Sequence, residues 1–172
     1  MKLIPLSKQG KNKGKYFAQV DDEDYDWLNQ YNWFVIEDEN TCYAKMVIRI
    51  DGKQKQIAMH NFIMGNTNKR LDVNHINFDG LCNIRSNLKI GTEQQNSVWR
   101  KKPNTPNPYS KYKGVGNSGI ISKPFRARIR VNGKKVHLGN FKTEIEAAQA
   151  YDKKLNEVYG EWAYTNFQHM YK

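Results

Sequence analysis

The chain has 172 residues, of which 38% are hydrophobic, and its 28 Lys and Arg side chains outnumber 17 Asp and Glu side chains to give a formal net charge of +11. Such an excess predicts a polyanionic partner, most often nucleic acid, and the length allows two small domains with modest cores. No apolar run approaches the ~20 residues that span a bilayer, and residues 1–15 lack the apolar core of a signal peptide. We therefore expect an intracellular, cytoplasmic protein without a membrane partner. The only two cysteines, Cys42 and Cys82, exclude a disulfide scaffold and a four-cysteine zinc site.

The N-terminal third predicts a small β-rich support. Residues 16–20 favour a strand, and residues 27–33 favour a short helix or turn that follows a run of acids. Asp51-Gly52 is a strong two-residue turn signal, so residues 42–50 and 53–59 are expected to pair as a hairpin. The acidic run at residues 21–24 is interpreted as a solvated helix start rather than a metal site, because consecutive carboxylates do not converge on one point.

Residues 60–96 hold the part of the chain that looks suited to chemistry. Residues 72–76 predict a strand with Val73 and His75 facing one side and Asn74 the other. A loop over residues 77–86 follows, and residues 88–90 can return as a second strand. Thr92 precedes Gln95 by three residues, which is typical of a capping box and predicts a helix with Asn96 in its first turn.

These polar residues suit the hydrolysis of a phosphodiester bond. His75 can take a proton from water near neutral pH, provided that a partner such as Asn87 fixes its other ring nitrogen. Asn74 and Asn96 offer oxygen atoms, and Mg²⁺ commonly takes only one or two protein oxygens and completes its octahedron with phosphate and water. We therefore consider His75 and Asn87 as catalytic residues and Asn74 and Asn96 as metal ligands.

The order of these residues resembles the HNH homing-endonuclease family, whose active site is a ββα-metal motif. The resemblance implies His75 as general base, Asn87 as its orienter, and Asn74 with Asn96 as ligands of one Mg²⁺ or Mn²⁺ ion per site. Position 74 is often Asp in that family, so we expect weak metal affinity in the absence of DNA. His60 stands where the family often has His-Arg, and here we favour a structural or phosphate-contacting role over a ligand role.

A proline-containing segment, residues 101–109, predicts a linker between two domains. The charge is divided unevenly around it. Residues 1–96 hold 13 basic and 12 acidic side chains, whereas residues 97–172 hold 15 basic and 5 acidic ones. Most of the electrostatic attraction to DNA is therefore expected from the C-terminal part.

Residues 125–131 alternate between apolar side chains and arginines, which predicts a strand with one basic face. Asn132-Gly133 favours a type I′ turn. That turn pairs Val131 with Lys134, Arg130 with Lys135, Ile129 with Val136, and Arg128 with His137. Accumulated positive charge on one sheet face indicates a phosphate-rich partner. The predicted DNA-contacting side chains are Arg126, Arg128, Arg130, Lys135, His137, Lys113 and Arg85.

A helix is predicted from Thr143, which forms a capping box with Glu146, to about Tyr159, where Gly160 supplies the stop. Its small residues are expected to keep it close to the sheet, while larger ones pack the core: Ala147, Ala148 and Ala150 in the first group, and Ile145, Tyr151, Leu155 and Val158 in the second. This helix is rich in Ala and nearly balanced in charge, which argues against a membrane-surface protein.

The C-terminal segment also resembles a known family, the AP2 DNA-binding domain. The motifs that carry the resemblance are residues 110–115 (SKYKGV), 128–130 (RIR), 137–141 (HLGNF), 146–152 (EAAQAYD) and 166–167 (NF). It implies a three-stranded antiparallel sheet, packed on one helix, that reads the major groove of duplex DNA. Phe125 stands near one of the sheet positions where that family has tryptophan.

Together these observations predict an α+β protein with an HNH nuclease domain at residues 1–100 (core 60–100), a linker at 101–109 and an AP2-like domain at 110–167. The expected function is a metal-dependent, site-directed DNA endonuclease, encoded by a bacterium or phage, that nicks one strand per monomer. We expect a monomer or weak dimer, with double-stranded DNA as the partner and no protein partner. The alternative is a non-catalytic DNA-binding regulator that retains a degenerate HNH core.

Overall fold

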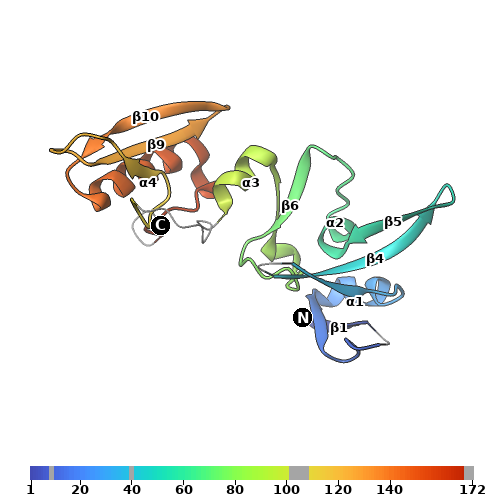
Figure 1. Cartoon of the computed structure of the whole chain (residues 1–172). Coiled ribbons are helices and arrows are strands. Elements are labelled where there is room, and N and C mark those ends of the chain that lie inside the picture. The colour runs from blue at the N-terminus through green and yellow to red at the C-terminus, as the bar shows by residue number, and fades with distance from the viewer. Residues whose placement is uncertain (8–9, 39–40, 101–108, 169–172) are drawn as a thin grey trace. The chain divides into compact units, whose positions relative to one another are not determined.

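The computed structural model describes residues 1–7, 10–38, 41–100 and 109–168, and it is a mixed α+β structure. The chain divides into two compact units, Met1–Glu93 and Gln94–Lys172, which are described separately below (Figure 1). The division precedes the predicted linker, of which residues 101–108 lie outside the described residues. Within the described ranges, no helix is long and apolar enough to cross a membrane.

The N-terminal unit contains three small antiparallel sheets. The first pairs β1 (Lys2–Leu6) with β2 (Tyr16–Val20), the second has the order β3 (Phe34–Glu37), β4 (Cys42–Ile50), β5 (Lys53–Ala58), and the third pairs β6 (Leu71–His75) with β7 (Leu88–Thr92). Helix α1 (Asp22–Leu28) follows β2, helix α2 (Met59–Ile63) follows β5, and a single 3-10 turn, η1 (Arg85–Asn87), precedes β7.

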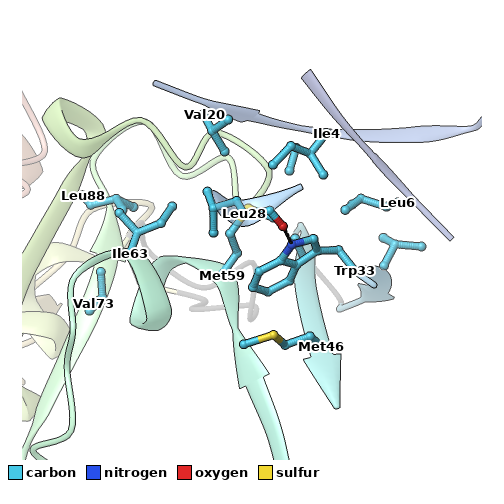
Figure 2. Close-up of a cluster of buried hydrophobic side chains, with 13 residues drawn as sticks. Ile4, Leu6, Val20, Leu28, Trp33, Met46, Met59, Ile63, Val73 and Leu88 are labelled. Carbon is cyan, nitrogen blue, oxygen red and sulfur yellow. Dashed lines mark hydrogen bonds between the residues drawn. The ribbon is translucent and has the colours of Figure 1, made fainter. Parts of the chain in front are cut away.

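One hydrophobic core joins these sheets. Its buried side chains come from β1, β2, α1, β3, β4, α2, β6 and β7, and Figure 2 shows them gathered around Trp33. The indole Nε1 of Trp33 donates a 2.8 Å hydrogen bond to the Leu28 carbonyl, so the buried polar atom has a partner. Val73 and Leu88, from the two strands of the third sheet, belong to the same cluster. The β6–β7 pair is therefore fixed to the rest of the unit.

The sequence predictions for this unit are confirmed in part. The strand at residues 16–20 and the hairpin of β4 and β5 are present, and its turn has positive φ at Asp51 (51°) and Gly52 (72°), as a two-residue hairpin turn requires. Strands β1 and β3 and helix α2 were not predicted, because each is at most five residues long and has no periodicity that distinguishes it from a loop.

The interpretation of the acidic run as a solvated helix start was wrong for Asp24. Its side chain is only 2% exposed and forms a two-pronged ion pair with Arg85, at 2.8 Å to Nε and 2.7 Å to Nη2. Asp21 accepts a 2.7 Å hydrogen bond from the Arg85 backbone N–H. Helix α1 is thereby tied to the segment between β6 and β7, a contact that depends on residues more than 60 positions apart.

The C-terminal unit contains a three-stranded antiparallel sheet of order β10-β9-β8 and the long helix α4. Its elements are α3 (Glu93–Trp99), β8 (Val115–Asn117), β9 (Phe125–Val131), β10 (Lys134–Phe141), α4 (Glu144–Tyr159) and the 3-10 turn η2 (Gly160–Trp162). Val98 of α3 is buried in one cluster with Ile129 of β9 and with Tyr151 and Leu155 of α4. Helix α3 therefore packs as part of this unit.

The predicted β9–β10 hairpin is confirmed residue by residue. All four predicted pairs occur in the register, and the turn residues Asn132 and Gly133 have φ of 49° and 76°. The register then shifts between His137 and Gly139, which is a β-bulge that the sequence did not predict.

Helix α4 also begins and ends as predicted, with the Thr143–Glu146 capping box present and Gly160 at positive φ (51°). Ala147 and Ala148 are fully buried, and Tyr151 and Leu155 are buried beside them. The expectation that Ile145 and Val158 pack in the core was wrong: they are 52% and 37% exposed, because they stand in the first and last turns of the helix.

Candidate active site and nucleic-acid interface

Strand β6 places the two central residues of the candidate active site on opposite sides. Val73 and His75 are 8% and 7% exposed, whereas Asn74 between them is half-buried, as the alternation predicted. In the antiparallel register with β7, His75 lies opposite Leu88 and Asn74 lies opposite Lys89. His75 therefore points into the unit while Asn74 faces the other side of the two-stranded sheet.

The His75 ring is held by an asparagine in the following loop. The Asn83 side-chain oxygen lies 3.2 Å from His75 Nε2, and Asn83 is fully buried. An amide oxygen can only accept, so this contact assigns the proton of the neutral ring to Nε2 and leaves Nδ1 with the lone pair of a base. Burial lowers the pKa of His75, while the hydrogen bond that Nε2 donates to Asn83 and the charge of Asp79 act in the opposite direction. The ring is consequently neutral near pH 7.

Asn87 was predicted to orient His75, but the structure gives this contact to Asn83. The Asn87 side-chain oxygen accepts a 3.0 Å hydrogen bond from Asn77 N–H, and its amide nitrogen donates to Asn77 Oδ1 (3.0 Å) and to the Cys82 carbonyl (2.7 Å). Asn87 thus joins the two ends of the loop. Cys82 immediately precedes Asn83. Asn87 therefore acts on His75 indirectly, by holding the backbone next to Asn83.

Three further hydrogen bonds fix the loop that carries Asn83. Gln19 of β2 accepts from Asn83 N–H and donates to the Leu81 carbonyl, both at 2.8 Å. Gly80 donates to Thr41 Oγ1 at 2.9 Å, and a Cβ on Gly80 would lie 2.6 Å from the Tyr43 ring and would overlap the Cys42 carbonyl. Only glycine fits this close approach. The loop is therefore a rigid support for the histidine.

A second histidine packs against the first. The rings of His60 from α2 and His75 meet edge to face, with 4.9 Å between centroids, and the Tyr43 ring lies 5.8 Å from His60 and 6.0 Å from His75. Burial, followed by the nearby His75 and Lys45, lowers the pKa of His60 to about 3. Its Nδ1 is buried without a hydrogen-bond partner. His60 is thus a neutral packing partner of His75 in this structure.

The predicted metal ligands lie in different units. Asn74 is on β6, where Asp72 shares its face of the strand, and Asn96 is on α3 in the C-terminal unit, where it is 4% exposed. Among the described residues, no group of three His, Cys, Asp and Glu side chains is placed to hold a metal ion. Asn74 follows Val73 on the face of β6 opposite to His75, and its neutral amide oxygen is a donor type that suits a hard cation whose remaining ligands come from phosphate and water.

The C-terminal sheet has one basic face, formed by Arg126, Arg128, Arg130, Lys135 and His137. The register places Arg128 opposite His137 and Arg130 opposite Lys135, and all four are exposed. A shallow hollow on this sheet is lined by Arg128, Arg130 and Lys135 together with the glycines that flank Val115 in β8. Because glycine has no side chain, a sugar-phosphate backbone could approach this part of the sheet closely and contact the exposed cations around it.

Two of the seven predicted DNA-contacting residues have structural partners instead. The Lys113 ammonium donates to the carbonyls of Val98 (2.9 Å), Arg100 (2.8 Å) and Tyr164 (2.9 Å), and burial lowers its pKa to about 8. All three of its donors are thus used within the unit. Arg85 is engaged with Asp24 as described above. We therefore leave both residues out of the proposed DNA-binding surface.

Sequence reasoning missed Asn83, Tyr43 and Gly80 as supports of His75. Asn83 lies between the apolar residues Cys82 and Ile84. Apolar neighbours are only a weak indication that an amide side chain is buried, so the sequence did not single out Asn83. Gly80 lies in the loop predicted over residues 77–86, where a glycine is an ordinary turn residue. Their roles depend on contacts with Gln19, Thr41 and Tyr43, which lie about 40 or more positions earlier in the chain.

Comparison with known proteins gave one relevant likeness. The chain is 28% identical over 169 residues, which cover 95% of this chain and 81% of the relative, to an uncharacterised HNH endonuclease of Acanthamoeba polyphaga mimivirus. No family model matches the chain. No solved structure matches it either.

Proposed function

We propose that this protein is a DNA endonuclease of the HNH kind, in which His75 activates the water that hydrolyses a phosphodiester bond. The observation that carries the proposal is the buried, neutral His75 whose Nε2 is held by Asn83. A base that is already neutral and oriented needs no reorganisation before it takes a proton. The likeness to the mimivirus HNH endonuclease supports the same activity.

In the proposed reaction, His75 Nδ1 accepts a proton from water as the water oxygen attacks the phosphorus atom. The bond from phosphorus to the 3′ oxygen breaks, and that oxygen takes up a proton from solvent. The imidazolium that forms is favoured by the Asn83 oxygen on Nε2 and by the negative charge of Asp79, both of which raise the pKa of His75. The product strand carries a 5′ phosphate and a 3′ hydroxyl.

The proposed cofactor is one Mg²⁺ or Mn²⁺ ion, and Asn74 is the proposed ligand in the N-terminal unit. When bound, such an ion stabilises the charge that develops on the phosphate and on the leaving oxygen. An amide oxygen contributes no negative charge, so phosphate oxygens must provide much of the binding. Lys89, opposite Asn74 in the register, adds a fixed positive charge on that side of the sheet.

The proposed targeting surface is the basic face of the C-terminal sheet. Arg128, Arg130 and Lys135 are exposed there, and a β-ribbon of this kind fits the major groove of duplex DNA. The resemblance to the AP2 domain points to the same face. We assign it duplex DNA as its partner.

The test is nicking of supercoiled plasmid in the presence of Mg²⁺ over a range of pH. His75→Ala should nick ~10²–10⁴-fold more slowly with unchanged DNA affinity. Asn83→Asp places a carboxylate on Nε2 and should raise the pKa of His75, so the acid limb of the rate profile should move to higher pH. Asn12→Asp, in the turn between β1 and β2, adds the same charge elsewhere and should leave the profile in place.

Two results would overturn the proposal. Nicking by His75→Ala at the rate of the parent would remove His75 from the mechanism. A parent that binds DNA but does not nick it with Mg²⁺ or Mn²⁺ would favour the non-catalytic regulator.

A further inference from the structure

The hairpin of β4 and β5 is longer than the sheet to which it belongs. Strand β3 pairs only with the first part of β4, from Cys42 to Lys45. Beyond that point β4 and β5 pair only with each other, as far as the turn at Asp51-Gly52. Figure 1 shows this part of the hairpin projecting past α1 and α2 of the same unit. We call this projection, residues 47–56, the arm.

Most side chains of the arm are exposed, although Ile48 at its base is half-buried and packs against the hydrophobic core of the unit. In β5 the four side chains from Lys53 to Gln56 are all exposed, and in β4 Val47 and Ile50 are 47% and 39% exposed. The register puts Val47 and Arg49 on one face with Gln56 and Gln54, and Ile48 and Ile50 on the other face with Lys55 and Lys53. A two-stranded ribbon that is mostly uncovered by other elements is only marginally stable in water. Its exposed apolar side chains gain free energy when a partner covers them.

The charge of the arm is positive. It carries Arg49, Lys53 and Lys55 against one acid, Asp51, which sits in the turn. Residues 1–96 hold 13 basic and 12 acidic side chains in all, so without the arm they hold 10 basic and 11 acidic ones. The three cations occupy both strands of one ribbon, so they can face phosphates on both sides of a groove.

We propose that the arm is a second DNA-binding element, which lies in a groove of the duplex next to the bond that the N-terminal unit cuts. This inference rests on the proposed nuclease function. A two-stranded ribbon fits the major groove, where Arg49, Lys53 and Lys55 reach the phosphates. The side-chain amides of Gln54 and Gln56 can both donate to and accept from base edges, and a Gln amide matches the edge of adenine. The arm thus contributes to the choice of cleavage position.

Lysine is also common on exposed sheet edges, where its charge prevents pairing with another chain. That role needs charge but not a particular sign. Reversing the charge of the arm therefore separates the two roles. If the lysines only protect the edge, Lys53→Glu with Lys55→Glu will leave DNA affinity unchanged. If they contact phosphates, the same change will weaken binding more than neutral substitution does.

The experiment measures binding of the full chain to a short labelled duplex in EDTA between about 50 and 200 mM salt. The arm variant combines Arg49→Gln, Lys53→Gln and Lys55→Gln. The matched control combines Lys11→Gln, Lys13→Gln and Lys15→Gln, three exposed lysines in the turn between β1 and β2 of the same unit. Circular dichroism checks that both variants fold.

The arm variant should lower the slope of log K against log salt by about 0.9 per lost phosphate contact, so by about 2 to 3 units for three contacts. The control variant should change the slope by less than the value of about 0.9 that corresponds to one phosphate contact. Equal slopes for arm variant, control and parent would overturn the proposal, and so would a concentration-dependent dimer that is lost in the arm variant, because the arm would then pair with a second copy of the chain.

Nicking with Mg²⁺ distinguishes this proposal from the proposed function. A parent that shows arm-dependent binding but no nicking supports the arm and overturns the nuclease. If the parent nicks DNA and the arm variant binds DNA as tightly and nicks it at the same positions, only the proposal that the arm binds DNA is overturned.

Discussion

The two histidines of the N-terminal unit differ in how far the sequence predicts their placement. The side to which His75 points follows from strict alternation along β6, so it was predictable. The residue that holds it was not, because Asn83 is placed by Gln19 and by the Asn87 clamp, which are tertiary contacts. His60 lies in a five-residue helix without a predictable face. Alternation along a strand therefore predicts the direction in which its side chains point, whereas the contacts made by a loop can be known only from the tertiary fold.

At the residue scale, His60 should make the unit sensitive to acid. The pKa of His60 is about 3 in the folded chain against 6.5 in the unfolded chain, so the unfolded state binds more protons between these values. The contribution of His60 is fully present above pH 6.5, and it is lost as pH falls toward 3, by about 1.4 kcal/mol per pH unit. His60→Phe keeps an aromatic ring beside His75 and removes this dependence.

The measurement is the free energy of unfolding by urea from pH 7 to pH 4, for the parent and for His60→Phe. The variant should show a shallower decline, with the remaining slope due in part to His75, whose pKa is also lowered. Parallel declines for the two proteins would show that His60 is not held neutral by burial.

At the scale of elements, prediction succeeded where a local signal is strong. The arginine alternation of β9, the Asn132-Gly133 turn and the capping box of α4 each act within a few residues, and each was found in place. Prediction failed for β1 and β3, which are five and four residues long and have no periodicity that distinguishes them from loops. The sequence, which predicted that Lys113 contacts DNA, also gave no sign of the packing of this residue, because no local pattern reveals three backbone carbonyls around an ammonium.

Lys113 should matter for stability and not for contact with DNA. Lys113→Met keeps the length of the side chain but leaves the carbonyls of Val98, Arg100 and Tyr164 without this donor. Unfolding free energy should fall by about 1–3 kcal/mol. The salt slope of DNA binding, measured below the unfolding transition, should equal that of the parent. As a contrast, Arg128→Gln on the basic face should lower the slope by about 0.9 and leave stability nearly unchanged. A lower salt slope with unchanged stability for Lys113→Met would contradict this prediction and would indicate that Lys113 contacts DNA.

At the scale of the whole molecule, the sequence predicted two parts but placed the boundary after helix α3. Composition draws attention to the prolines of residues 101–109, whereas packing assigns α3 to the C-terminal unit. Val98 is buried in the core of that unit, and Gln94 donates hydrogen bonds to Tyr159 (2.8 Å) and Asn132 (3.3 Å). A composition change marks a break in periodicity, which need not coincide with a break in packing.

The packing of α3 predicts how fragments should behave. A fragment of residues 94–172 should fold and bind duplex DNA with a steep salt dependence, because it holds the whole basic face and most of the net charge. A fragment of residues 106–172 lacks Val98 and two of the carbonyls that Lys113 binds, so it should unfold at lower temperature. Thermal unfolding of both fragments by circular dichroism is the measurement. Equal midpoints would mean that α3 contributes nothing to the unit.

The same feature bears on how such a protein can exchange parts during evolution. A crossover in the proline-containing segment would give the recipient a sheet and helix without Val98, and would leave the donor with a helix whose apolar side has lost its cover. A crossover between β7 and α3 would leave the hydrophobic core of each unit intact. It would transfer Asn96 together with the basic face. Recombination that preserves folding should therefore move Asn96 together with the basic face, so that an exchange of the proposed DNA-binding surface would also replace a residue that the HNH resemblance implies as a metal ligand.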